Sequence, residues 1–343
     1  MMRVLVTGAG GLIGGELVAR LAAAGHEVTA LLHRNRAIIA NNGTPVAVAT
    51  LFGDIRQPGL GLGDNPQFDL IVHAAAVTSF DAPTDVYRAV NVDGTRHVIA
   101  LAERRLTPLV YVSTAYVCGV CDAIVREGER GDMFSNGYEA SKAAAESLVE
   151  AAALRGLPTV IARPSIVVGD SATGRLRTFD NIYLMLRLIA ERRLRTLPGA
   201  MHATLDLVPI DHVAGGIAAL VAGFDRARGK TVHLVAAQAT ALPLLAAAIA
   251  AVPGLGQPAF VDPASFDRAA LPPAERRWHA VAAPYMSYLL RAPRFDTANA
   301  ATLVPPCPPT DAAWLGRLLH ACLDAGYLSA RPGNASPMPA AEC

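Results

Sequence analysis

The sequence predicts an α/β fold, in which a doubly wound parallel sheet carries a smaller C-terminal substrate lobe. Short apolar runs alternate with segments of helical periodicity over the first 169 residues, and a glycine-rich turn joins the first run to the first helix. Beyond this point the chain becomes richer in arginine and then in proline. Alternating strands and helices imply a parallel sheet covered by helices, with ligands at the carboxyl ends of the strands.

The predicted sheet is built from apolar runs that indicate strands buried on both faces. These runs span residues 3–8, 27–34, 46–54, 69–76, 109–114 and 159–169. Apolar residues at helical spacing, with glycine or proline at the ends, predict helices over 12–25, 85–105 and 138–156. A strand-turn-helix unit over 208–223 and a strand over 230–236 follow.

The same pattern predicts how the chain divides. We expect a sheet domain over residues 1–169 and 206–237, and a substrate lobe over 170–205 and 238–330. Residues 331–343, which are rich in proline and small residues, are expected to be a disordered tail.

Composition excludes several classes of protein. The formal net charge of +1 argues against a nucleic-acid-binding surface. No uninterrupted apolar stretch reaches the length of about eighteen residues that indicates a membrane span. The N-terminus enters a strand directly, without the pattern of a signal peptide, so a cytoplasmic protein is expected. The five cysteines and the histidines do not combine into a zinc-binding pattern, and no metal is expected.

The first turn, "TGAGGLIG", has the features of a dinucleotide-binding turn. Gly8, Gly11 and Gly14 lie between the first strand and the first helix, with Leu12 and Ile13 between the last two glycines. Glycines permit a tight turn and close approach of a diphosphate to the backbone, and the helix N-terminus supplies amides and a positive dipole end. The alternative is a turn with a purely structural role.

The end of the second strand distinguishes between cofactors. An acidic residue there would bind the ribose hydroxyls of NAD, but this chain has His33, Arg34 and Arg36. Arginine can grip a 2′-phosphate with two hydrogen bonds, so the sequence favours NADPH. The alternative is that these residues are solvated loop side chains and that NAD is tolerated.

In "NGYEASKAAAE", residues 136–146, Tyr138 precedes Lys142 by four positions on a predicted helix. Only Lys142 and Lys230 are lysines among the 30 basic residues of the chain. Residues four apart lie on one face of a helix, so both side chains can reach one ligand. We expect the ammonium to lower the pKa of the tyrosine and to make it an acid/base group. The alternative is an ordinary amphipathic helix.

The motifs together resemble the extended short-chain dehydrogenase/reductase family, whose fold is the Rossmann fold. They are "TGAGGLIG", "GDI" (53–55), "HAAA" (73–76), "NVDGT" (91–95), "STAYV" (113–117), "YEASK" (138–142) and "RPSIVVG" (163–169). "RPSIVVGDSATG", "LDLVPIDHVA" and "FDTANAATL" (295–303) are similar to the subgroup of thioester reductases and fatty acyl-CoA reductases.

This resemblance implies roles for individual residues. It implies that Asp54 and Ile55 border the adenine, and that Asn91 props the active-site helix. It further implies a catalytic set of Thr114, Tyr138 and Lys142, with threonine where many members have serine. Other residues would line the cofactor, with Pro164 and Ser165 along the nicotinamide and the backbone of Ala74, Ala75 and Ala76 beside it.

The resulting functional prediction is an NADPH-dependent reductase of secondary metabolism. Its expected substrate is an acyl thioester, bound to coenzyme A or to a carrier protein, with an aldehyde or alcohol as product. Two alternatives are a sugar-nucleotide or hydroxysteroid-type dehydrogenase or epimerase, and a non-catalytic protein that senses NADP.

Three further patterns bear on the substrate and on partners. Arginines within residues 170–200 can dock an acidic carrier or the phosphates of coenzyme A, or can form a solvated helix face. Residues 184–186 and Ile189 can line an acyl pocket or belong to the core. The small residues 143–145 permit a homodimer contact, or packing against the protein's own sheet.

Overall fold

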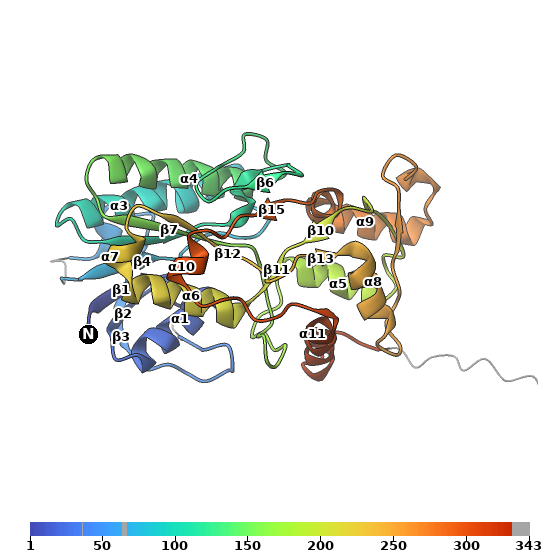
Figure 1. Cartoon of the computed structure of the whole chain (residues 1–343), viewed down its shortest axis with the longest axis horizontal. Coiled ribbons are helices and arrows are strands. Elements are labelled where there is room, and N and C mark those ends of the chain that lie inside the picture. Colours follow the sequence, from blue (N-terminus) through green and yellow to red (C-terminus); the bar gives the residue numbers. More distant parts are fainter. Residues whose placement is uncertain (36, 64–66, 331–343) are drawn as a thin grey trace, which may run out of the picture.

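A parallel sheet of seven strands forms one half of the molecule (Figure 1). The structure, a computed structural model, describes residues 1–35, 37–63 and 67–330. The strand order is β12-β7-β5-β4-β1-β2-β3, and every neighbouring pair is parallel. The strands are β1 (Arg3–Thr7), β2 (Glu27–Leu32), β3 (Ala49–Phe52), β4 (Leu70–His73), β5 (Leu109–Val112), β7 (Thr159–Pro164) and β12 (Thr231–Leu234). The predicted doubly wound parallel sheet is confirmed.

Two layers of helices cover the sheet (Figure 1). On one face lie α3 (Gly94–Glu103) and α4 (Gly137–Leu154), whose apolar side chains join one buried cluster with the strands. On the other face lie α1 (Leu12–Ala23) and α6 (Ile210–Ala222), which contribute to a second cluster. Each helix presents its apolar stripe to the sheet, as its spacing predicted.

Three predicted elements differ from the structure. The run 159–169 divides into β7 and β8 (Ile166–Val168), and β8 leaves the sheet to pair with β11 (Leu207–Pro209). Strand β3 is largely exposed, because it is an edge strand, and so is not buried on both faces. The predicted helix 85–105 is one continuous helical segment, but its hydrogen-bonding pattern changes along its length. It consists of α2 (Thr84–Tyr87), a π-helical turn η2 (Arg88–Asp93) and α3.

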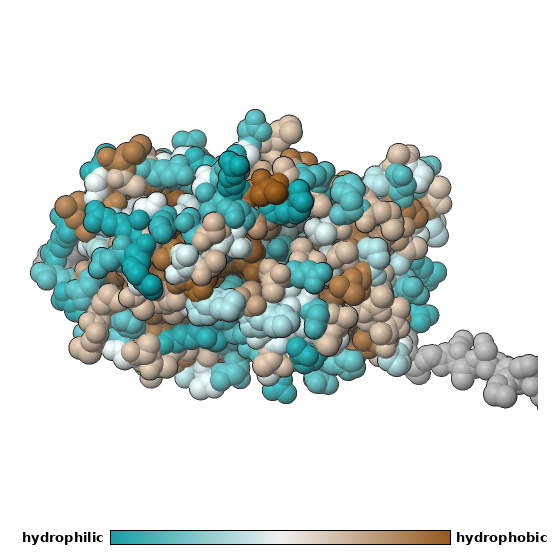
Figure 2. Space-filling model, in the orientation of Figure 1, coloured by the Kyte–Doolittle hydropathy of each residue, from teal (hydrophilic) through white to brown (hydrophobic). Residues whose placement is uncertain are grey.

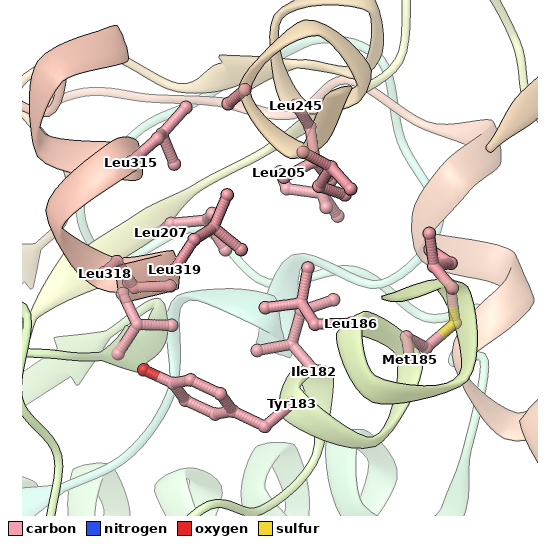
Figure 3. Close-up of a cluster of buried hydrophobic side chains, with 14 of the residues drawn as sticks. Ile182, Tyr183, Met185, Leu186, Leu205, Leu207, Leu245, Leu315, Leu318 and Leu319 are labelled. Atoms are coloured by element: carbon pink, nitrogen blue, oxygen red, sulfur yellow. The ribbon is translucent and has the colours of Figure 1, made fainter. Parts of the chain in front are cut away.

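A second lobe packs at the carboxyl ends of the strands (Figure 1). Its helices are α5 (Ile182–Ala190), α8 (Leu242–Ala250), α9 (Pro273–Met286) and α11 (Ala312–Asp324). They meet in a buried cluster that includes Met185 and Leu186 (Figure 3). Ile189 belongs to the same cluster, and Leu184 packs against it. None of these four residues lines either of the two cavities described below, so the core interpretation replaces that of an acyl pocket.

One segment expected in the lobe lies against the sheet domain. Strand β15 (Arg294–Phe295) pairs with β6 (Ile124–Val125), and α10 (Ala300–Leu303) contributes Ala300 and Leu303 to a cluster of the sheet. The chain therefore returns to the sheet domain before it forms α11. The expected disordered tail, 331–343, lies outside the described residues.

Short elements complete the fold. They are η1 (Pro58–Gly61), η3 (Ala115–Cys118), β9 (Thr196–Pro198), β10 (Thr204–Leu205), α7 (Phe224–Ala227), β13 (Thr240–Ala241), β14 (Ala259–Val261), η4 (Arg268–Ala270) and η5 (Ser287–Leu290). Among the helices of the described ranges, none is long and apolar enough to cross a bilayer. Figure 2 shows one face of the molecule, where hydrophilic side chains are interspersed with smaller hydrophobic groups.

Candidate active site

The glycine turn between β1 and α1 forms a cradle that only glycine fits. Gly8 has φ +74°, and a Cβ there would lie 2.6 Å from the amide nitrogen of Ala75. A Cβ on Gly14 would lie 2.1 Å from the carbonyl oxygen of Gly8. Both contacts are far shorter than van der Waals distance, so the backbone here is as open as a bound diphosphate requires. These residues fit a nicotinamide dinucleotide.

Two cavities meet at this turn and share Gly8, Gly10 and Gly11 in their linings. The first, of about 600 Å³, brings together the ends of β2 and β4 with the loop after β3, and its lining includes His33, Arg34, Asp54, Ile55 and residues 74–76. The second, of about 460 Å³, reaches the end of β5 and the start of α4, and its lining includes residues 12–14, Thr114, Tyr138, Pro164 and Ser165. Asn91 and Lys142 line neither cavity.

The first cavity has cationic side chains at its outer end. Arg34 is exposed there, while His33 lies 3.5 Å from Asp54. Arg56 forms a 2.6 Å ion pair with Asp54, and this hydrogen-bonded partner lowers the pKa of the carboxyl to about 2. Sequence reasoning missed Arg56, although it follows the "GDI" motif directly. Arg36 lies outside the described residues.

Tyr138 is held at the start of α4 by the residues before it. The Asn136 side chain accepts a 2.9 Å hydrogen bond from the Glu139 amide and so caps the helix. A Cβ on Gly137 would lie 2.6 Å from the Tyr87 ring, so glycine permits the close approach of α4 to α2. The Tyr138 ring stacks on Phe80 with centroids 5.8 Å apart, at the wall of the second cavity.

Thr114 precedes η3 at the end of β5 and faces the same cavity. Its Oγ1 accepts a 3.3 Å hydrogen bond from the amide of Tyr116. An oxygen that accepts from an amide keeps its own hydrogen available for a ligand. Burial raises the pKa of Tyr138, and a side-chain hydrogen bond with Thr114 opposes this increase. The side chains of Thr114 and Tyr138 thus line the same cavity and interact electrostatically.

The expectation that Lys142 lowers the pKa of Tyr138 is not met in the structure. Its Nζ donates a 2.8 Å hydrogen bond to the carbonyl oxygen of Val112 and lies 4.2 Å from the centroid of the Tyr111 ring. Burial lowers the pKa of Lys142 to about 7, while the charge of Glu146 opposes this shift. The pKa of Tyr138 is raised and not lowered, because burial outweighs every opposing interaction. Spacing alone did not reveal how deeply both groups are buried.

Asn91 connects the cofactor side to the helix that carries Tyr138. Its Nδ2 donates a 2.9 Å hydrogen bond to the Ser141 hydroxyl on α4, and also contacts the carbonyl oxygen of Val77 at 3.0 Å. Its Oδ1 accepts a 2.8 Å bond from the Val77 amide. Both the nitrogen and the oxygen of this buried amide are hydrogen-bonded, and together they fix one loop and one helix.

Two parts of the site were not found from the sequence. Aromatic rings form a wall of the second cavity, contributed by Phe80, Tyr116 and Tyr288. Buried Asp206 accepts a 2.5 Å hydrogen bond from Ser165 Oγ and a 2.8 Å bond from the Ala236 amide. Ser165 and Asp206 are 41 positions apart, and no local pattern joins them. Within the described ranges, no cluster of three His, Cys, Asp or Glu residues is placed to hold a metal.

The arginines within residues 170–200 do not form one free basic patch. Arg187 and Arg193 both pair with Glu191, at 2.9 and 2.6 Å. The Arg193 guanidinium also lies over the ring of Trp278. These internal partners favour the interpretation of a solvated helix face over that of a docking surface.

Comparison with known proteins places the chain in a family. The profile of the family described as "Male sterility protein" matches residues 6–217. The hybrid PKS-NRPS synthetase pydA of Acremonium sp is 34% identical over 231 residues, which is 62% of this chain but only 5% of that synthetase. A 4-hydroxy-2-methyl-3-oxo-4-farnesyl-3,4-dihydroquinoline-1-oxide ketoreductase of Stigmatella aurantiaca is 29% identical, over 68% of each chain.

One solved structure is similar to this chain over nearly its whole length. The terminal R domain of the myxalamid PKS-NRPS pathway superposes with a TM-score of 0.77 and 27% identity, over 96% of this chain and 92% of that domain. The glycine cradle, the parallel sheet and the profile match all indicate the same family of dinucleotide-binding proteins. The chain belongs to the male sterility protein family, within the extended short-chain dehydrogenases/reductases.

Proposed function

We propose that the protein reduces an acyl thioester with NADPH. One observation carries this proposal: the second cavity joins the glycine turn to the hydroxyls of Thr114 and Tyr138, beside a wall of aromatic rings. Two protein hydroxyls at one end of a dinucleotide cradle suit a carbonyl that is reduced there. The likeness to synthetases and to a terminal R domain supports a thioester as the source of that carbonyl.

The proposed chemistry assigns one task to each side chain. When bound, the cofactor supplies a hydride to the thioester carbonyl carbon. Thr114 and Tyr138 donate hydrogen bonds to the carbonyl oxygen, where negative charge develops, and Tyr138 delivers its proton to that oxygen. The resulting hemithioacetal breaks its C–S bond and gives an aldehyde and a thiol. A second reduction would give the alcohol.

Lys142 has a proposed role in cofactor positioning. The ammonium is already fixed by the carbonyl oxygen of Val112, at the end of β5 and close to Thr114. From this position it is proposed to hold the nicotinamide ribose. Its positive charge is also proposed to favour proton transfer from the Tyr138 hydroxyl. A pKa of about 7 allows the group to gain or lose a proton near neutral pH.

The aromatic wall supports an acyl substrate over a sugar nucleotide. Phe80 stacks on Tyr288 with ring centroids 5.5 Å apart and an interplanar angle of 7°. Among the described residues that line the second cavity, which exclude Arg36, Arg177 is the only Lys or Arg. A nucleotide sugar brings a second diphosphate, which would need further cationic partners. An acyl chain needs apolar surface.

A second candidate is the reduction of a ketone. The relative from Stigmatella aurantiaca is a ketoreductase, and it matches this chain over 68% of its own length. The same two hydroxyls would serve a ketone oxygen, and no thiol would leave. The two candidates therefore differ in product and not in catalytic residues.

A substrate panel separates these possibilities. Purified protein is incubated with NADPH and with acyl-CoA, acyl-pantetheine and carrier-bound thioesters, while cofactor absorbance and trapped aldehyde are measured. We expect thioester-dependent cofactor oxidation with release of free thiol, at one thiol per NADPH for an aldehyde product and one thiol per two NADPH for an alcohol. Turnover of a ketone, a hydroxysteroid or a nucleotide sugar, with no thioester consumed, would contradict the proposal. Repeating the panel with NADH tests the cofactor.

A further inference from the structure

Arg177 reaches the glycine turn from a distant part of the chain. It lies between β8 and α5, in the segment that leads into the second lobe. Its Nη2 donates a 3.0 Å hydrogen bond to the carbonyl oxygen of Gly11, the residue that precedes α1. The two residues are 166 positions apart. A cationic side chain from the lobe segment thus lies across the turn.

The backbone around Arg177 is fastened to the sheet domain. The Arg177 amide donates to Oδ1 of Asn41, and Nδ2 of Asn41 donates to the carbonyl oxygen of Arg175, both at 3.0 Å. The Asn41 amide in turn donates a 2.9 Å bond to Glu16 on α1. These contacts fix the base of the Arg177 side chain relative to α1, the helix that follows the turn.

The guanidinium of Arg177 has unused capacity. Its Nε is buried and has no hydrogen-bond partner among the described residues. A buried donor without a partner costs free energy comparable to a lost hydrogen bond, so the position suits a ligand that supplies an acceptor. The Gly11 carbonyl also accepts from the Gly15 amide, so Arg177 is not needed to satisfy it.

The charge around the second cavity points to the same ligand. Of the cavity-lining residues within 1–35, 37–63 and 67–330, only Arg177 is a Lys or Arg and only Asp180 is an Asp or Glu. A dinucleotide diphosphate carries two negative charges, whereas the α1 N-terminus supplies only about half a positive charge. Gly11, Leu12 and Ile13 of the turn line the same cavity as Arg177.

We propose that Arg177 binds the diphosphate of the nicotinamide cofactor. On cofactor binding, the guanidinium exchanges its bond to Gly11 for the diphosphate oxygens, and its planar fork allows two parallel hydrogen bonds. Because this residue belongs to the segment that leads into α5, cofactor binding also ties that segment to the glycine turn. The inference needs a bound dinucleotide and does not depend on a thioester substrate.

Binding measurements without any acyl substrate test this role. NADPH, NADP⁺ and NADH are titrated against wild-type protein and Arg177→Gln, with fluorescence and calorimetric readouts. We expect all three dissociation constants to increase by a similar factor, on the order of 10-fold to 100-fold. Adenosine 2′-monophosphate, which lacks the diphosphate, should bind both proteins equally. Arg177→Lys keeps the charge without the fork and should lie between them.

Arg175→Gln is the matched control, because Arg175 is exposed and its contact with Asn41 is made by the backbone, which the substitution keeps. It should bind every ligand as the wild type does. Unchanged dinucleotide binding by Arg177→Gln would overturn the proposal. An equal loss of adenosine 2′-monophosphate binding would also overturn it, because the effect would then be structural. Failure of thioester reduction alone would not, since no substrate is present in these titrations.

Discussion

The buried guanidinium of Arg291 lies 2.5 Å from Oε1 of Glu139, the residue directly after Tyr138. The same carboxyl oxygen accepts a 2.6 Å bond from the Tyr288 hydroxyl, and the second Arg291 nitrogen donates to the carbonyl oxygen of Gly119. Both charged side chains are almost fully buried, at 2% and 0% exposure. This ion pair thus connects the C-terminal part of the chain to the first turn of the helix that carries Tyr138.

Glu139→Gln should lower both stability and turnover. Removing one charge leaves Arg291 buried without a counter-charge, a change that typically costs about 3–5 kcal/mol. Turnover should fall because the first turn of α4 loses its anchor. Denaturant unfolding and kcat are measured in parallel. The control is Glu103→Gln, at the exposed pair with Arg155, which should cost less than about 1 kcal/mol. Equal effects of the two variants would contradict the role given to burial.

Tyr138→Phe should abolish most catalysis while leaving cofactor binding intact. The change removes only the phenolic hydroxyl, and the ring can still stack on Phe80. Loss of a general acid typically costs on the order of 10²-fold to 10⁴-fold in rate. Steady-state kcat and NADPH titration are the two measurements. Tyr285→Phe is the control, because Tyr285 contacts Phe80 without lining the cavity, and its kcat should stay close to that of the wild type.

The contribution of Thr114 to kcat should come from its hydroxyl and not from its methyl group. Thr114→Ala removes one donor to the developing oxyanion, and we expect a loss in kcat on the order of 10²-fold to 10³-fold. Thr114→Ser keeps the donor and should remain within about tenfold of the wild type. Ser113 lines the same cavity and serves as a control, with little expected change for Ser113→Ala. Equal activity of the Ala and Ser variants at 114 would refute this assignment.

The sequence predicted those strands whose burial is evident from their own residues. Central strands of a parallel sheet are buried on both faces, so β1, β4 and β5 were recognisable as apolar runs. The break between β7 and β8 was not, because two consecutive apolar strands are separated only by Ser165. Strand β3 was misjudged, since its edge position depends on where the sheet ends.

The site shows the same division between local and long-range information. The turn around Gly8 and the neighbouring positions of Thr114 and Tyr138 follow from motifs that occupy short stretches of sequence. The contacts Glu139 to Arg291 and Ser165 to Asp206 cross 152 and 41 positions, and only the folded chain brings them together. The low pKa of Lys142 likewise results from burial, which depends on the packing of the whole helix.

Arg34 should discriminate between the two nicotinamide cofactors. Its side chain is exposed at the outer end of the first cavity, whereas Arg56 nearby is neutralised by Asp54. Arg34→Ala should raise the KM for NADPH by about tenfold or more, because a charge-assisted bond to the 2′-phosphate is lost. The KM for NADH should not change. Arg88→Ala, at an exposed pair with Asp93, is the control. An equal increase for both cofactors would exclude a 2′-phosphate contact.

Asp206 should make stability depend on pH in a predictable direction. Burial raises its pKa to about 6, although hydrogen bonds from Ala236 and Ser165 oppose the shift. Between its ordinary value of 3.8 and about 6, the folded protein holds a proton that the unfolded chain has lost. This carboxyl therefore stabilises the fold most below pH 4, and that contribution is lost as the pH rises through 6, by up to about 3 kcal/mol.

Asp206→Asn tests this sign directly, because the amide keeps a carbonyl acceptor for Ser165 and Ala236 but does not titrate in this range. The unfolding free energy of the variant minus that of the wild type should become more positive from pH 4.5 to pH 7, whatever other groups contribute to both proteins. Ser165→Ala removes a donor that favours the carboxylate, so the wild-type transition should move to higher pH in that variant. A difference between Asp206→Asn and wild type that is constant over this range would show that Asp206 keeps an ordinary pKa in the folded protein.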